Sequence, residues 1–225
     1  MFINKNFIIF LPFLYFNLAL SFYKNIQTIS NKNSLYTSII PDIPQTNLYS
    51  NILLPYLTPQ DKIILSSDEM IKKQERNGSR GFGLVIVDIE CSPDLVFDTL
   101  AKFSSYQDMI PIVKSSKIIS SDDINTFVEF TLSKFLLRIN VKHTVLKDQR
   151  LIKFTLDHNH VNLLFREATG FWHVEIPTDR PEGYCRVYLS TEILTHKNVP
   201  KLIMDYAEAK ALSSATKWLK PFFIK

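Results

Sequence analysis

Residues 81–103 read GFGLVIVDIECSPDLVFDTLAKF, and this stretch decides the fold. Its first part, Gly81 to Glu90, is rich in β-branched residues and predicts a strand. Ser92 followed by Pro93 is a helix start signal, because serine can cap a first turn and proline fits the first helical position. Apolar residues at helical spacing then predict a helix from Leu95 to Phe103, with the Ser92 hydroxyl accepting a backbone N–H bond. We therefore expect a strand that runs directly into a short apolar helix.

Most of the remaining chain predicts antiparallel strands. Glu69 to Arg76 is joined to Gly81 to Glu90 by Asn77-Gly78-Ser79-Arg80, a hairpin signal that we take to explain the nearby Gly81 and Gly83 as well. From Leu137 to Val145, apolar and polar residues alternate, which predicts a strand with one apolar, buried face and one polar, solvent-facing side. Further strands are expected at Val113 to Ser120, Thr126 to Ser133, Leu136 to Leu146, Leu151 to Asp157, Phe165 to Ile176 and Tyr184 to Leu194.

The C-terminal segment from Val199 to Phe222 carries one long amphipathic pattern, with apolar residues at three- and four-residue steps. Its central face consists of small residues, among them Ala209 and Ala215. Such a face either lets the helix pack closely on a sheet or leaves room above the sheet for a ligand. The sequence leaves both interpretations open.

The order of one strand, short helices, a run of antiparallel strands and a long last helix is that of a helix-grip domain. Over roughly Glu69 to Phe222, the chain resembles the START-like superfamily, in particular its polyketide cyclase/dehydrase and lipid-transport branch, which includes coenzyme-Q-binding proteins. The resemblance implies an α+β fold in which a curved antiparallel sheet wraps around a long C-terminal helix. It marks a fold more than a chemistry, because one fold can host many functions. The segments that carry the resemblance are 92–100 (SPDLVFDTL), Phe103, Tyr106, 110–113 (IPIV) and Phe165 to Trp172.

The net charge does not favour a nucleic-acid partner. The 225 residues carry a formal charge of +4, with a pI near 8.9. Residues 1–41 contain Lys5, Lys24 and Lys32 and no acid, so the rest of the chain has 26 − 3 = 23 basic against 22 acidic residues. Because that part is nearly neutral and shows no run of alternating basic and aromatic residues, we expect no nucleic-acid binding.

The N-terminus is typical of a two-part targeting sequence. Phe7 to Ser21 is an apolar run that is short for a spanning helix, and it predicts a signal peptide over residues 1–21. Residues 22–41 are rich in hydroxyl and amide side chains and free of acids, which is typical of a transit peptide. Together they resemble the presequence of proteins imported into plastids with extra bounding membranes. The alternatives are an uncleaved anchor, or a signal peptide and polar linker on a secreted or endomembrane protein.

The presequence is followed by a segment that we do not assign to the core. This segment contains three prolines, Pro41, Pro44 and Pro55. Thr58-Pro59 then predicts the start of a short helix that ends at about Ser67. We therefore expect residues 42–67 to be a linker with a short helix, and residues 68–225 to be the START-like domain.

No pattern nominates a catalytic or metal site. His158 and His160 lie in a polar segment without further ligands at a recognisable spacing, so we interpret this segment as a loop. There is no nucleophile elbow, and carboxylates such as Glu129 lack an evident partner for proton transfer. We interpret Cys91 and Cys185 as small apolar side chains, although the sequence leaves a disulfide between them open. No cofactor is expected, and the sequence favours a protein without catalysis while leaving an enzymatic role open.

What remains is an apolar interior, and ligand pockets are mostly apolar with a few polar groups. We predict that the protein binds or carries a hydrophobic small molecule such as a lipid, isoprenoid quinone or pigment precursor, with transient membrane contact. The alternatives are a polyketide-type cyclase or dehydratase, and a protein- or ribosome-binding module. His143 and Arg166 are the candidate polar anchors. The candidate ligand-binding residues are Phe103, Tyr106, Ile110, Phe130, His143, Phe154, Phe165, Arg166, Trp172 and Tyr206.

Overall fold

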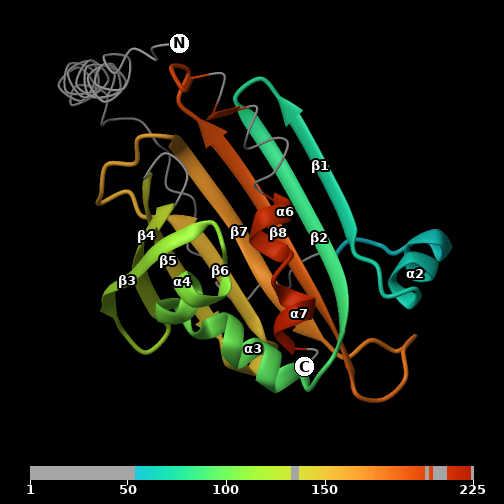
Figure 1. The fold of residues 1–225 in the computed structure, drawn as a ribbon. Helices are drawn as coiled ribbons and strands as arrows, with labels where there is room; N and C mark the ends of the chain where they lie inside the picture. Colours follow the sequence, from blue (N-terminus) through green and yellow to red (C-terminus); the bar gives the residue numbers. More distant parts are fainter. Residues whose placement is uncertain (1–53, 133–136, 201–202, 205–211, 224–225) are drawn as a thin grey trace, which may run out of the picture. The chain divides into compact units, whose positions relative to one another are not determined.

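Eight antiparallel strands form one curved sheet that dominates the fold (Figure 1). The computed structural model describes residues 54–132, 137–200, 203–204 and 212–223. The strand order is β1-β2-β8-β7-β6-β5-β4-β3, so β1 and β3 are the two edges of the sheet. The strands are β1 Ile71–Asn77, β2 Arg80–Glu90, β3 Val113–Ser121, β4 Asn125–Leu132, β5 Arg138–Leu146, β6 Leu151–Leu156, β7 Phe165–Glu175 and β8 Tyr184–Thr195.

The predicted strands are confirmed, and each ends within about two residues of its expected position. β3 to β8 follow one another as a meander, and β8 then returns to pair with β2. The connection from β2 to β3 carries α3 (Pro93–Ala101), the short helix η2 (Phe103–Ser105) and α4 (Tyr106–Met109). In Figure 1, α3 lies at the lower end of the sheet and α4 lies above it, beside β3.

The glycines of the first hairpin have two different roles. Gly78 lies in the tight turn with a φ of 58°, a conformation that glycine adopts without strain. Gly81 and Gly83 lie inside β2, so the expectation that the turn explains them was wrong. A Cβ on Gly83 would stand 3.2 Å from the side chain of Leu212, the first residue of helix α6 (Leu212–Thr216). The missing side chain therefore gives α6 room on the sheet.

Helix α3 begins at Pro93 as predicted, but its cap differs from the expected one. The side chain of Ser92 makes no capping hydrogen bond, so that part of the prediction was wrong. Pro93 already removes one of the free N–H groups at this helix end, which reduces the need for a side-chain acceptor. The Ser92 carbonyl instead accepts the first helical bond from Val96, at 3.1 Å.

The short helix α2 (Pro59–Ser66) does have the full cap that its sequence predicts. The Asp61 backbone N–H donates to the Thr58 hydroxyl at 3.1 Å, and the Thr58 N–H donates to the Asp61 carboxylate at 3.0 Å. Because each residue satisfies a free backbone donor of the other, the two form a capping box. These bonds and the neighbouring Lys73 hold the pKa of Asp61 below its usual value, against a smaller opposing effect of burial.

The C-terminal segment is not one continuous helix. Residues 205–211 lie outside the described part, and the described remainder consists of helical residues at 203–204, α6, and α7 (Leu219–Phe223). A turn at Lys217 and Trp218 separates α6 from α7. The cause is Pro221, which has no N–H for the carbonyl of Lys217 and whose ring would clash with that carbonyl in a continuous helix. Pro221 instead lies in the first turn of α7, where proline is tolerated.

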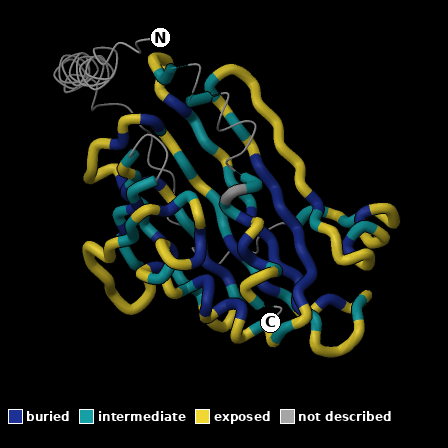
Figure 2. Tube along the Cα trace, in the orientation of Figure 1, coloured by how far each residue is buried: buried dark blue, intermediate teal, exposed yellow. Residues whose placement is uncertain are grey.

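The main core lies between the sheet and the helices, toward the lower end of the strands (Figure 2). On β2, Val85 and Val87 are buried in this core together with Trp218 of the C-terminal segment. The alternate residues Leu84 and Ile86 are also buried, although they point to the opposite face. Since α2 packs on β1 and β2, it covers that outer face. Pro55–Lys225 therefore form one unit that includes α2.

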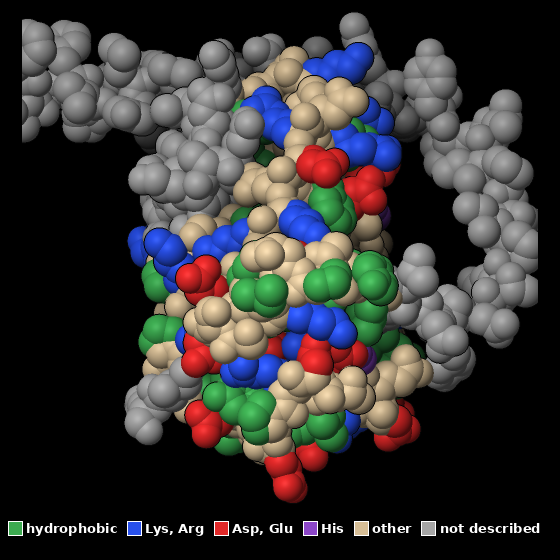
Figure 3. Space-filling view, turned by 90° about the vertical axis from the view of Figure 1, so that its right-hand side faces the viewer, with side chains coloured by type: hydrophobic (Ala, Val, Ile, Leu, Met, Phe, Trp, Pro, Cys, Tyr) green, Lys and Arg blue, Asp and Glu red, His purple; other side chains and the backbone are tan. Residues whose placement is uncertain are grey.

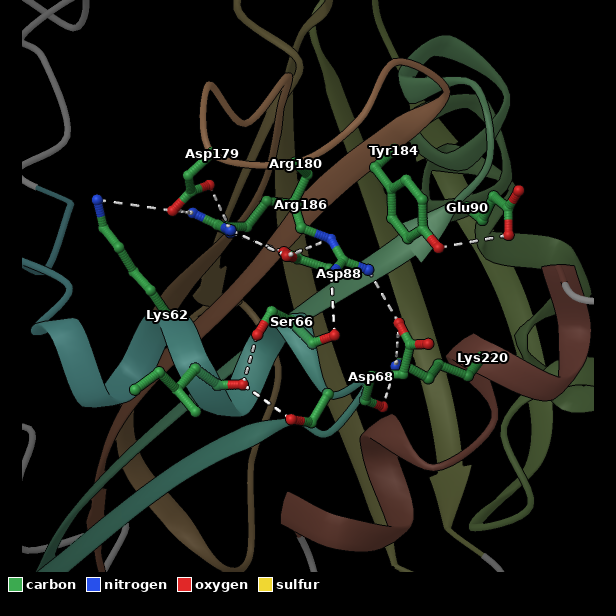
Figure 4. A network of polar contacts seen from close by, with 12 residues as sticks. Lys62, Ser66, Asp68, Asp88, Glu90, Asp179, Arg180, Tyr184, Arg186 and Lys220 are labelled. Atoms are coloured by element: carbon green, nitrogen blue, oxygen red, sulfur yellow. Dashed lines mark hydrogen bonds and ion pairs between the residues drawn. The ribbon is translucent and has the colours of Figure 1, made fainter.

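A buried ion pair lies under α2 on this outer face (Figure 4). Arg186 of β8 donates two hydrogen bonds to Asp88 of β2, at 2.7 and 2.9 Å, and a third to Asp179 at 2.8 Å. The Asp88 side chain is fully buried. Burial by itself raises the pKa of Asp179, but the bonds and charge of Arg186 outweigh it and leave this pKa below its usual value.

Arg180, in the β7–β8 loop, extends this network to the end of α2 (Figure 4). Its guanidinium donates to the Ser66 carbonyl at the end of α2, at 3.1 Å, and to the Asp68 carboxylate at 3.0 Å. Lys220 of α7 donates to the Asp68 backbone carbonyl. Asp68, just after α2, thus contacts both the β7–β8 loop through Arg180 and the C-terminal helix through Lys220.

Both cysteines are free thiols that belong to the core, which confirms their interpretation as small apolar side chains. Cys185 on β8 is fully buried, and Cys91 is half-buried just after β2. Burial raises the pKa of Cys185 to about 12, and the neighbouring Cys91 acts in the same direction. The Cys185 thiol is therefore protonated at neutral pH.

The edge of the sheet formed by β1 is polar. Its residues from Lys72 to Asn77 are exposed, and Figure 3, which faces this side, shows Lys, Arg, Asp and Glu side chains interspersed with small hydrophobic clusters. Charges on an edge strand disfavour pairing with another chain. Within the described parts of the chain, no helix has the length and apolar character to cross a membrane.

Candidate ligand-binding cavity

A cavity of about 360 Å³ lies between the sheet, the α4–β3 connection and the C-terminal helix α6. Its interior walls are mostly apolar, whereas its charged residues, Glu75, Arg76 and Arg80, belong to the β1–β2 hairpin. The described residues that line it are Gln74, Glu75, Arg76, Ser79, Arg80, Gly81, Phe82, Gly83, Tyr106, Ile110, Ile112, Val113, Phe130, Leu132, Ile139, Val141, His143, Phe154, Phe165, Trp172, Leu189, Thr191, Ile193, Met204, Leu212 and Ala215.

Most of these residues line the cavity because side chains alternate between the two faces of a strand. On β8, every second residue from Leu189 to Ile193 faces the cavity, and on β5 the same holds from Ile139 to His143. Successive side chains of a strand point to opposite faces, so one apolar set from each strand reaches the same space. The apolar face that the sequence predicts for β5 is thus the face that lines the cavity.

Gly170 allows a bulky ring to form part of the wall. It lies opposite Phe154 in the pairing of β6 with β7. A Cβ on Gly170 would stand 2.4 Å from the Phe154 ring and 2.2 Å from the Ser190 backbone oxygen. Because neither distance is tolerable, only glycine lets Phe154 lie across β7.

A cluster of aromatic rings surrounds His143. The ring of Phe103 stacks on the imidazole with centroids 4.1 Å apart, and Phe130 meets it edge-on at 5.8 Å. Phe154 lies at 6.3 Å on the next strand. Tyr106 extends the cluster by stacking on Phe130 at 5.6 Å. The imidazole is therefore held in an apolar environment, and only 4% of the residue is exposed.

This environment keeps His143 uncharged at neutral pH. Burial lowers the pKa of His143 from 6.5 to about 3, and the Thr126 backbone opposes this only in part. Its Nδ1 atom is buried and has no hydrogen-bond partner among the described residues. His143 thus contributes a neutral polar atom to an otherwise apolar region.

Tyr106 also stays neutral, but its polar atom is already used. Its hydroxyl donates to the Leu100 carbonyl at the end of α3, at 2.6 Å. Burial raises the pKa of Tyr106 far above its usual value. The hydroxyl therefore fixes the ring on the cavity wall and is not a proton donor for chemistry at neutral pH.

The structure brings most of the predicted site residues together. Phe103 is buried behind His143 in the core and is not a wall residue. Arg166 is exposed at the bulge of β7 and does not line the cavity. Tyr206 lies outside the described residues. The predicted residues that line the cavity are Tyr106, Ile110, Phe130, His143, Phe154, Phe165 and Trp172.

The sequence analysis missed several aliphatic wall residues because it searched for aromatic ones. Val141 and Ile139 share the alternating face of β5 with His143, and the same alternation on β8 would have identified Leu189 and Ile193. The polar cavity residues of the β1–β2 hairpin could not be identified from the sequence in this way. Their position beside the cavity depends on how β1 pairs with the rest of the sheet.

Comparisons with known proteins identify the fold. No family model matches the sequence, and no curated protein matches it. A STAR-related lipid transfer protein from Xanthomonas axonopodis superposes with a TM-score of 0.52 at 12% identity, over 68% of this chain and 99% of that one. A START superfamily protein from Mycobacterium smegmatis gives 0.50 at 11% identity, over 68% and 96%. A Streptomyces aromatase/cyclase gives 0.47 at 13% identity, over 67% and 87%.

The protein therefore has the START-like helix-grip fold, an α+β architecture in which an unclosed antiparallel sheet curves around C-terminal helical structure. This confirms the fold that the sequence resemblance implies. Within this fold, the cavity has mostly apolar inner walls, which is the usual character of ligand pockets.

Proposed function

We propose that this protein binds and carries a hydrophobic small molecule, such as a lipid, an isoprenoid quinone or a pigment precursor, without covalent chemistry. The observation that carries the proposal is the cavity of about 360 Å³ with apolar inner walls. This volume lies in the usual range for ligand pockets, roughly 300–1,000 Å³. The similarity in fold to a lipid transfer protein supports the same class of ligand.

The ionisable groups of the inner cavity favour binding over catalysis. Among the described wall residues away from the hairpin, these groups are His143 and Tyr106. The hydroxyl of Tyr106 is engaged with a backbone carbonyl, and no described hydrogen bond links His143 to a carboxylate. General acid–base catalysis needs a titratable group with a pKa near the operating pH, and neither group meets that condition.

Filling the cavity tests the proposal. Ala215 of α6 lines the cavity, so Ala215→Phe should place a ring inside it and weaken binding of cis-parinaric acid, a fluorescent C18 fatty acid, by at least tenfold. Lys217→Phe adds the same ring at an exposed position two residues further on and should leave uptake unchanged. Both variants of the full-length protein are checked for folding by circular dichroism. Folded Ala215→Phe protein with undiminished uptake would remove this cavity from the proposal.

We further propose that the protein is imported into a plastid with extra bounding membranes. The support is the apolar run Phe7 to Ser21 followed by the acid-free segment up to Pro41, in a region outside the described residues. A fusion of residues 1–41 to a fluorescent protein should enter the plastid, whereas residues 1–21 alone should direct it into the secretory pathway. Secretion of both fusions would favour the secreted alternative.

A further inference from the structure

The loop between β6 and β7, residues 157–164, holds a polar side chain inside the protein and two aliphatic side chains outside it. Asn162 is 8% exposed, and its side chain bonds to three backbone groups at 3.0–3.1 Å. Its neighbours Val161 and Leu163 are 72% and 43% exposed. Burial normally favours the reverse arrangement. The loop is therefore fixed in a conformation that presents two aliphatic side chains to the surroundings of the protein.

This loop lies beside the opening of the cavity. The described wall residues that are exposed all belong to the β1–β2 hairpin, so the cavity opens there; they are Gln74, Glu75, Arg76, Arg80 and Phe82. The end of β8 connects the hairpin to the loop. The Thr195 N–H donates to the Ser79 carbonyl at 2.9 Å, and the N–H of the next residue, His196, donates to the Leu164 carbonyl at 3.0 Å. In Figure 1, the hairpin and the end of β8 lie at the upper end of the sheet.

The exposed charges around the loop are mainly basic. The loop contains one acid, Asp157, but its side chain is 5% exposed and lies 2.8 Å from Nδ1 of His160. The exposed charged residues at the start of β5, just after the loop and just after β8 are Arg138, Arg166 and Lys197, with one acid, Glu167. The three turns at the other end of the sheet contain five acids, Asp122, Asp123, Asp148, Asp179 and Glu182, and three bases, Lys147, Arg150 and Arg180. The end that carries the cavity opening is thus the one suited to an anionic partner.

We propose that this end of the protein docks on a lipid bilayer with an anionic surface, with Val161 and Leu163 inserted among the headgroups. Aliphatic side chains leave water when they enter this layer, and basic residues beside them are attracted to the lipid phosphates. Docking in this way places the cavity opening at the membrane, where a hydrophobic ligand can enter or leave without crossing water. The inference rests on the proposed carrier function and adds the surface through which the ligand is exchanged.

A tryptophan in place of Val161 tests the insertion. Full-length Val161→Trp is mixed with vesicles of phosphatidylcholine that contain about one-third phosphatidylglycerol, and its emission should shift to the blue and be quenched by brominated acyl chains. Ile176→Trp, at a 64% exposed position just after β7, is the matched control and should show no change beyond that of wild-type protein. Both variants share the same N-terminal residues and the same Trp172 and Trp218, so their difference reports the loop. In vesicles of phosphatidylcholine alone, the quenching of Val161→Trp should be at least fivefold weaker.

The transfer of cis-parinaric acid between such anionic vesicles tests the role of the surface. Full-length protein with both Val161→Ser and Leu163→Ser should transfer it at least fivefold more slowly than wild-type protein. Its uptake from water should stay unchanged, because neither residue lines the cavity. Protein with both Ile63→Ser and Ile176→Ser loses two exposed aliphatic side chains elsewhere and should keep the wild-type rate.

Three results would overturn the docking surface and leave the carrier function intact. They are equal quenching of Val161→Trp and Ile176→Trp, equal quenching of Val161→Trp in neutral and anionic vesicles, and a wild-type transfer rate in the variant with both serines. Absence of quenching in both tryptophan variants would instead favour a protein partner on this surface. Failure of wild-type protein to take up cis-parinaric acid from water would overturn the carrier function, while the quenching experiment would still measure the docking.

Discussion

Acidification should reveal His143 as a buried neutral histidine. In the unfolded chain a histidine takes up a proton near pH 6.5, whereas the pKa of His143 in the folded protein is about 3. Between these values the unfolded state binds more protons than the folded state, so stability is complete above pH 6.5 and falls as the pH is lowered. The slope is about 1.4 kcal/mol per pH unit once the unfolded histidine is protonated. From pH 7 to pH 5, His143 should therefore cost the protein about 2 kcal/mol of unfolding free energy.

Urea unfolding at pH 7, 6 and 5 measures this loss. His143→Phe should lose about 2 kcal/mol less than wild-type protein over this range, because phenylalanine does not titrate. The pKa of His173 is also lowered by burial, but His173 is present in both proteins and cancels from the difference. His158→Phe should follow the wild-type profile. Equal losses in wild-type protein and His143→Phe would mean that the imidazole is hydrated or charged, and the account of the aromatic cluster would be wrong.

Four further substitutions test the packing, the caps and the buried ion pair, each by urea unfolding. Gly170→Ala should destabilise the protein by about 1–3 kcal/mol, because its Cβ would overlap the Phe154 ring and a backbone oxygen; wild-type stability would contradict the close packing. Thr58→Ala should cost about 1 kcal/mol and Ser92→Ala only a few tenths, since only Thr58 makes a side-chain cap; equal losses would refute this distinction. Arg186→Met should cost about 3–5 kcal/mol because it leaves Asp88 buried without its main partner, and a loss below about 1 kcal/mol would show that Asp88 reaches water.

The sequence by itself determined the local structure of this protein. The run of β-branched residues before Ser92-Pro93 established the junction between β2 and α3, and alternation located the later strands within about two residues. These signals depend on torsional preference and on the period of side chains along one strand, and both are local. The resemblance at 92–100 and Phe165 to Trp172 was then sufficient for the helix-grip fold.

The tertiary structure decided which residues form the cavity and what their chemical state is. The sequence proposed both Phe103 and Phe154 as ligand-binding residues, yet Phe103 is buried in the core and Phe154 forms the cavity wall. Phe154 can do so because Gly170 on the neighbouring strand leaves room for its ring. The uncharged state of His143 depends on aromatic rings from α3–α4, β4 and β6. Strand register brings such groups together across long stretches of chain, and no local pattern records that register.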